Sequence, residues 1–113
     1  MKLLNQYQYH NDSKYKVLDL IEASKKLKVF KIKVSDIFIN YECPCNNTLT
    51  DFIKHVKNVN EVTFEYPIIL SPDNFILDGK HRVAKAIIEN KKYIKAVRFK
   101  KMPDCKEYIT TNE

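Results

Sequence analysis

Hydrophobic side chains recur along the first third of the chain with two different spacings. Val17, Leu20 and Ile21 fall near helical spacing, which predicts a short helix within residues 16–27. In residues 29–34, apolar side chains alternate with lysines, as they do in a strand that is buried on one face. The fold is therefore predicted to open with a helix and a half-buried strand.

The clearest helical pattern covers residues 48–59. Its apolar positions recur every three or four residues and share one face, which we expect to be buried against a sheet; they are Leu49, Phe52, Ile53, Val56 and Val59. Asn47 or Thr48 is suited to cap this helix, and Asp51 is favourable in its first turn.

The second half of the chain predicts a hairpin, a helix and a final strand. Residues 66–70 and 75–78 are short apolar runs, separated by the turn-forming residues Ser71-Pro72-Asp73-Asn74. A helix follows from Lys80 or His81, and residues 94–99 form the last strand. The expected buried face of that helix is Val83, Ala84, Ile87 and Ile88. This order of elements predicts a mixed α/β (α+β) fold.

The length and composition limit the class of protein. A chain of 113 residues has room for one core, and we divide it into an N-terminal arm (1–15), a domain (16–101) and a C-terminal tail (102–113). No apolar run reaches the 18 or so residues of a membrane helix, and the first residues turn polar too early for a signal peptide. Three cysteines are too few for a disulfide framework. We therefore expect a cytoplasmic protein with no membrane partner, and the oligomeric state stays open.

Positive charge is concentrated in one segment of the sequence. The net charge is +6. Residues 1–79 are neutral, whereas residues 80–101 hold nine basic residues against Glu89. This excess fits a phosphate-bearing partner such as DNA, and it equally fits a solvated helix and strand. The candidate nucleic-acid contacts are Lys85, Lys91, Lys92, Lys95 and Arg98.

Gly79 is the only glycine of the chain and lies between a predicted strand and a predicted helix. A glycine kept at this point indicates a tight turn with positive φ or a close backbone approach. A strand, a glycine turn and a helix N-terminus together form an anion site, because backbone N–H groups point outward there. Lys80, His81 and Arg82 add cationic or donor groups to it. The residues alone therefore favour phosphate binding, the alternative being a plain corner with exposed basic side chains.

The sequence from about Val29 to Phe99 resembles the ParB/sulfiredoxin superfamily. The resemblance covers about two-thirds of the chain and rests on the order of elements and on Asp78-Gly79-Lys80-His81-Arg82. Partition proteins carry Gly-Glu-Arg-Arg-x-Arg-Ala at this corner, and sulfiredoxins carry Gly-Gly-Cys-His-Arg, with Lys80 here at the position of the catalytic cysteine. Free serine kinases of the same fold carry Asp-Gly-His-His-Arg, from which only Lys80 departs. The resemblance implies a small mixed sheet flanked by helices and a nucleotide bound at the corner.

The resemblance also implies roles for individual residues. Gly79, Lys80, His81 and Arg82 would bind the phosphates of ATP or CTP. Catalysis would use Asp78 and His81, together with Glu42 from a loop that corresponds to the one used by the kinases. From the residues themselves, Arg82 can grip two phosphate oxygens and His81 can move a proton near neutral pH. Asp78 can hold Mg²⁺ or orient a hydroxyl, or it can cap the helix.

The leading hypothesis is an ATP-dependent phosphotransferase or nucleotide hydrolase. The alternatives are a ParB-like DNA-binding protein or nuclease, and an accessory or inhibitor protein that kept the fold and lost catalysis. Cys43, Cys45 and Cys105 fall short of the four ligands of a structural zinc site, and we expect none. His55 is expected to be a residue on the surface of its helix.

Overall fold

The computed structural model describes residues 7–10, 13–39, 48–103 and 106–107. It is an α+β structure of two sheets and three α-helices in the described part of the chain, which confirms the predicted class. The elements in chain order are β1 (Tyr7–His10), β2 (Ser13–Lys16), α1 (Val17–Ser24), β3 (Phe30–Lys33), a 3₁₀ turn (Val34–Asp36), α2 (Leu49–Glu61), β4 (Ile68–Leu70), β5 (Ile76–Asp78), α3 (Lys80–Ile88), β6 (Tyr93–Arg98) and β7 (Lys106–Glu107).

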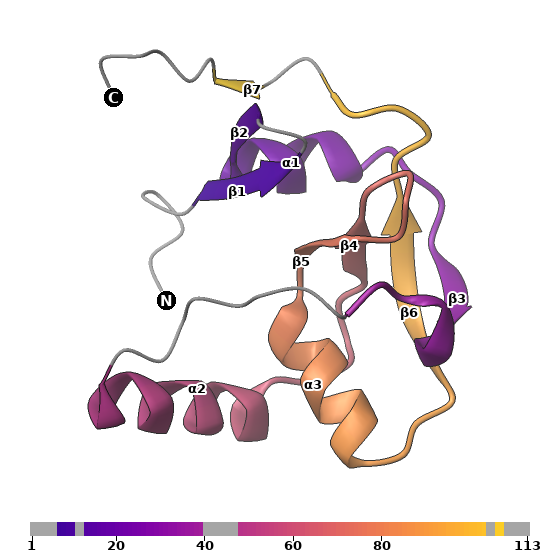
Figure 1. The fold of residues 1–113 in the computed structure, drawn as a ribbon. Helices are drawn as coiled ribbons and strands as arrows, with labels where there is room; N and C mark the ends of the chain where they lie inside the picture. Colours follow the sequence, from indigo (N-terminus) through magenta and orange to yellow (C-terminus); the bar gives the residue numbers. More distant parts are fainter. Residues whose placement is uncertain (1–6, 11–12, 40–47, 104–105, 108–113) are drawn as a thin grey trace.

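The main sheet has four strands in the order β3-β6-β4-β5 (Figure 1). β4 and β5 form an antiparallel hairpin, whose turn is held by Ser71: its Oγ accepts the N–H of Phe75 at 3.0 Å, and Asn74 takes a φ of 67°. α3 then returns the chain so that β6 runs parallel to β4 and antiparallel to β3. The sheet is therefore mixed. β6, which lies between β3 and β4, is the last of its four strands in the sequence.

Two hydrophobic clusters cover the two faces of this sheet. In β4, Ile68 and Leu70 pack toward α3, where Val83 and Ala86 are buried, whereas Ile69 packs on the other face with Leu20 of α1. Alternate residues of a strand point to opposite faces, so α1 and α3 lie on opposite sides. The core position that we did not predict on α3 is Ala86; the predicted Ile87 and Ile88 are exposed.

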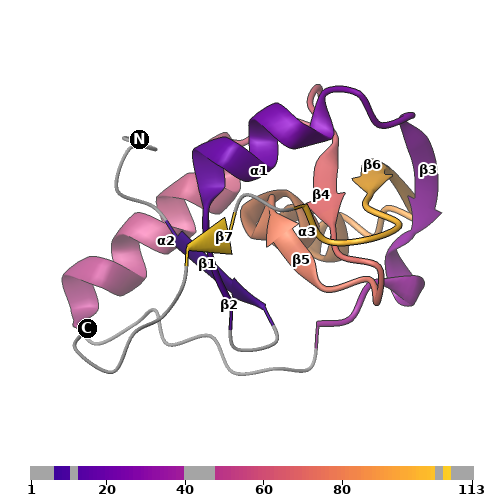
Figure 2. The same cartoon turned by 90° about the horizontal axis from the view of Figure 1, so that it is seen from above.

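A second, smaller sheet has the strand order β1-β2-β7 and lies beside α1, apart from the main sheet (Figures 1 and 2). It includes residues that we predicted as an N-terminal arm, together with a two-residue strand from the predicted C-terminal tail. Tyr15 of β2 is buried in the cluster around Leu20. The arm therefore contributes to the core, and the tail returns to pair with it.

α2 is a helix where we predicted one, but its predicted burial is wrong. Thr48 is its N-cap and accepts the N–H of Asp51 at 3.1 Å. None of its thirteen residues is buried, and the helix projects beyond the main sheet (Figure 1). It contacts the rest of the chain mainly through α3, so its apolar stripe is not covered by the sheet. Among the described residues, none of the helices has the length and apolar character needed to cross a bilayer.

Candidate functional site

The corner between β5 and α3 is built around Gly79. Its φ is +103°, a conformation that L-residues rarely adopt. A Cβ placed on it would lie 2.6 Å from Cγ2 of the buried Ile68. The positive φ predicted from the sequence is confirmed, and the close approach to Ile68 gives a second reason for glycine. The positive φ and the close approach to Ile68 together fix the position of the N-terminus of α3.

The first turn of α3 presents donors and positive charge. Its N-cap, Gly79, has no side chain to accept the first helical N–H groups, and the turn contains no acidic residue. Lys80, His81 and Arg82 occupy its first three positions. A helix N-terminus attracts anions through these N–H groups and the helix dipole. The positive charges of Lys80 and Arg82 oppose the helix dipole at this terminus, and a bound anion would offset that repulsion.

Arg82 is held against the turn that it follows. Its Nη1 donates to the carbonyl oxygen of Pro67 at 3.3 Å and lies 3.1 Å from the position that a Cβ on Gly79 would occupy. A guanidinium has five N–H donors, so this contact orients the group and leaves donors for another acceptor. Arg82 is therefore positioned both by Pro67, which directly precedes β4, and by Gly79.

Asp78 and Lys80 flank the glycine on either side. Asp78 is half-buried at the end of β5 and does not cap α3, whose N-cap is Gly79. Lys80 is exposed. Within the described residues, no group of three His, Cys, Asp or Glu side chains is placed to hold a metal ion.

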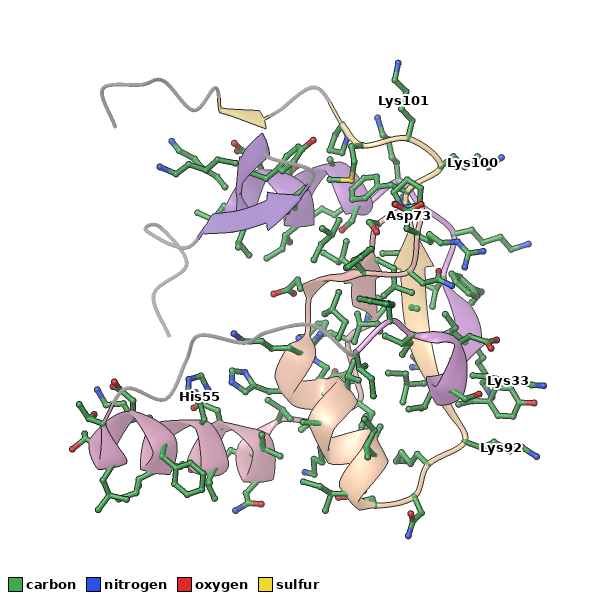
Figure 3. The ribbon with its side chains drawn as sticks, in the orientation of Figure 1. Lys33, His55, Asp73, Lys92, Lys100 and Lys101 are labelled. Atoms are coloured by element: carbon green, nitrogen blue, oxygen red, sulfur yellow. The ribbon has the colours of Figure 1, made fainter. Side chains whose placement is uncertain are left out.

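His81 is paired with His55 of α2, a partner that the sequence analysis missed. His55 Nδ1 lies 3.1 Å from His81 Nε2, and Figure 3 shows His55 rising from α2 on the side of α3. The ring centres are 5.4 Å apart. This is nearly the largest separation of ring centres that a nitrogen–nitrogen distance of 3.1 Å allows, so both nitrogens lie close to the line that joins the two ring centres. This is the geometry of an N–H···N hydrogen bond, whereas two ligands of one metal ion would approach it at an angle.

The surroundings of His81 favour its neutral form. Burial lowers the pKa of His81 below its ordinary value, and the charges of Lys80, His55 and Arg82 lower it further, while Asp78 acts in the opposite direction. A neutral imidazole can donate at one nitrogen and accept at the other. If His55 donates to Nε2 of His81, then Nδ1–H of His81 is a donor, so His55 can set the tautomer that faces an anion.

We expect His81 to make the folded state sensitive to mild acid. The pKa of His81 is lower in the folded protein than in the unfolded chain, so at a pH between these two values the unfolded chain binds a proton more readily. The contribution of His81 to stability is therefore complete above the ordinary pKa of about 6.5 and is lost as the pH falls through the lower pKa of the folded protein. Melting temperatures measured from about pH 8 to about pH 5 should fall less steeply for His81→Gln than for the parent. An identical pH slope in the two proteins would contradict this role.

Glu42 and the three cysteines, Cys43, Cys45 and Cys105, lie outside the described residues. The described part of the site therefore consists of Asp78, the glycine corner, the first turn of α3 and His55. Two hollows on the described surface, of about 490 and about 460 Å³, lie elsewhere, along β3 and beside the end of α1.

The candidate nucleic-acid residues are divided among different places. Lys85 Nζ donates to the carbonyl oxygens of Asn60 and Val62 at the end of α2, and Lys91 lies over the ring of Phe64. Arg98 donates to Asn74 Oδ1 at 2.8 Å and stacks on the ring of Phe30. Lys92 extends from one end of the main sheet, as Lys33 does, and Lys100 and Lys101 extend from the opposite end (Figure 3). Positive charge that is continuous in sequence is thus spread in space.

Lys95 has a basic neighbour that the sequence analysis did not single out. In the register of β3 and β6, Lys31 lies directly opposite Lys95, and Lys33 lies opposite Tyr93. All four side chains are exposed. Like charges directly opposite each other destabilise a sheet, and an anion bound between Lys31 and Lys95 would offset that repulsion.

In comparisons with known proteins, no family model, no curated protein and no solved structure matches this chain.

Proposed function

We propose that this chain is a nucleotide-binding protein of the ParB/sulfiredoxin type, with the phosphates bound at the corner formed by Gly79 and the first turn of α3. The observation that supports it best is the left-handed Gly79, which joins a strand directly to a helix whose first three residues are Lys80, His81 and Arg82. Backbone N–H groups, the helix dipole and these side chains all favour the same negatively charged group. The sequence resemblance supplies the identity of that group as a nucleotide.

The roles of the side chains follow from their positions. Arg82, oriented by the Pro67 carbonyl, would bind phosphate oxygens, and the ammonium group of Lys80 would neutralise their charge. His81, kept largely neutral in the fold, would donate to a phosphate or accept a proton from an attacking hydroxyl. Asp78 would hold a Mg²⁺ ion that arrives with ATP or CTP. This set is suited to phosphoryl transfer, which needs mainly positioning and charge neutralisation.

Arg82→Ala is expected to weaken nucleotide binding at least tenfold. The loss removes charge-assisted hydrogen bonds, each worth roughly 1.5–3 kcal/mol. Calorimetric titration with ATP and CTP, with and without Mg²⁺, measures the effect. The chain has one other arginine, Arg98, whose contacts are with Asn74 and Phe30, so Arg98→Ala is the matched control and should bind as the parent does.

Parental affinity in the Arg82→Ala protein would contradict the proposed site. We also expect Arg82→Ala to melt close to the parent, because its one described hydrogen bond is long and only partly buried. A coincident loss of fold and binding would show instead that Arg82 acts through the structure of the corner.

A second candidate function, binding of nucleic acid, is favoured by the Lys31–Lys95 pair with Lys33 and Tyr93 beside it. Lysines follow a phosphate backbone, and an exposed tyrosine can stack on a base. The salt dependence of binding distinguishes nucleic-acid binding from nucleotide binding. Binding of an oligonucleotide should weaken steeply with salt, with a slope near one unit per phosphate neutralised, and Lys31→Gln/Lys95→Gln should reduce that slope. Loss of nucleotide binding in the same variant would mean that there is one site.

The third alternative, an inactive accessory protein, predicts binding without turnover. The parent would then bind ATP or CTP at the Gly79 corner and release no phosphate or nucleoside diphosphate. A coupled assay for phosphate release, run with the titration, distinguishes this case from an enzyme.

A further inference from the structure

The exposed surface of α2 carries a stripe of large apolar side chains. Leu49, Phe52, Ile53 and Val56 are 73%, 50%, 56% and 45% exposed. Their spacing of three and four residues places them on one face of the helix. Monomeric proteins rarely leave a contiguous apolar patch of this kind in water, and such patches mark interaction sites.

The described part of the chain packs against a different side of α2. The residues of α2 that are half-buried are mostly polar: Asp51, His55, Asn58 and Val59. His55 pairs with His81, and Lys85 of α3 reaches the carbonyl oxygens of Asn60 and Val62 at the end of the helix. These polar contacts fix α2 to α3 through a face of the helix that does not include the exposed apolar stripe.

An unpartnered stripe does not account for the stability of this helix. A helix of thirteen residues is marginal by itself in water, and most helices in proteins are stabilised by packing of their apolar face. Because that face is uncovered among the described residues, we expect another molecule to cover it. A second copy of the chain is available wherever the protein is made, and the covered form becomes more populated as the protein concentration rises.

The charges favour a second copy over an anionic surface. α2 contains two acidic and two lysine residues, whose charges cancel, although the chain as a whole carries +6. The stripe itself contains no charged residue, so it is complementary to itself, as an interface between two identical copies requires. A lipid or nucleic-acid surface would instead be bound through excess positive charge, which this helix lacks.

We propose that the α2 stripe is the contact surface between two copies of this chain. One helix from each copy makes a small interface, so we expect a reversible dimer that dissociates in the micromolar range.

Sedimentation velocity over a dilution series of the full chain tests the dimer. The parent should change from dimer to monomer on dilution, and Phe52→Ser/Val56→Ser should raise the dissociation constant at least tenfold. The matched control is Tyr93→Ser/Val29→Ser, which also replaces an aromatic residue and a valine, 46% and 49% exposed, away from α2. This control should dissociate as the parent does.

Circular dichroism checks that each variant is folded. If the double variant of α2 loses its structure, Ile53→Lys, which places a charge in the stripe, is to be compared with the parent instead. A parent that is monomeric at all concentrations would overturn the proposal, as would equal weakening by the control variant. A monomeric parent that binds phosphatidylserine vesicles, with binding lost in Phe52→Ser/Val56→Ser, would overturn it in favour of a membrane.

Discussion

Gly79→Val is expected to reduce the free energy of unfolding more than any other single change at the site. Valine at a φ of +103° costs about 1–3 kcal/mol in backbone strain. Its Cβ would also meet Cγ2 of Ile68 at 2.6 Å, and overpacking of a core adds about 1–3 kcal/mol. Urea denaturation of the variant and the parent measures the sum. Nucleotide binding should be lost as well, because the start of α3 would move.

The strain and the steric clash can be separated with a second position. Asn90 also has a positive φ, of 57°, but it is exposed. Asn90→Val should therefore show the backbone cost without the clash and be the milder of the two. Equal destabilisation would show that Ile68 does not limit the corner, and a Gly79→Val protein as stable as the parent would contradict the left-handed turn.

Leu20→Ala should destabilise the domain by about 2–5 kcal/mol, the usual cost of truncating a buried leucine. Leu20 is completely buried between α1 and the main sheet, in contact with the cluster that includes Ile69 and Tyr15. Leu18 lies two residues away on the same helix and is 37% exposed, so Leu18→Ala is the matched control, with an expected cost below about 1 kcal/mol. Similar losses in the two variants would contradict the assignment of α1 to the core.

The sequence predicted most elements of the main sheet, because their signals are local. Alternation located β3, the turn residues around Asn74 located the hairpin, and the solitary Gly79 located the corner and its positive φ. The β1–β2 hairpin was missed although a signal existed: Tyr7 and Tyr9 alternate with polar residues before the turn-forming pair Asn11-Asp12, and Tyr15 lies between two lysines after it.

The remaining errors concern contacts between distant segments. The stripe of α2 predicted an amphipathic helix, but the same pattern arises whether a sheet of the same chain or another molecule covers it. His55 could not be paired with His81 from the sequence, since the two are separated by 26 residues and meet only when α2 packs on α3. For the basic segment of residues 80–101 the sequence left two interpretations open, a phosphate-binding surface and a solvated helix and strand, and in the structure a helix, a strand and two loops direct its side chains to different places.

The position of β6 inside the main sheet bears on how the chain folds during synthesis. β3 pairs only with β6 within this sheet, and β4 has β6 as its second neighbour, so the sheet cannot form until residues 93–98 have left the ribosome. Until then, β3 and the β4–β5 hairpin have no strand to join them. Contacts between segments that are far apart in the sequence slow folding. Until β6 is available, the exposed edges of the unpaired strands are prone to pair with other chains. Ribosome-bound chains that end before β6 should therefore be protease-sensitive, and protection should arise abruptly once β6 emerges.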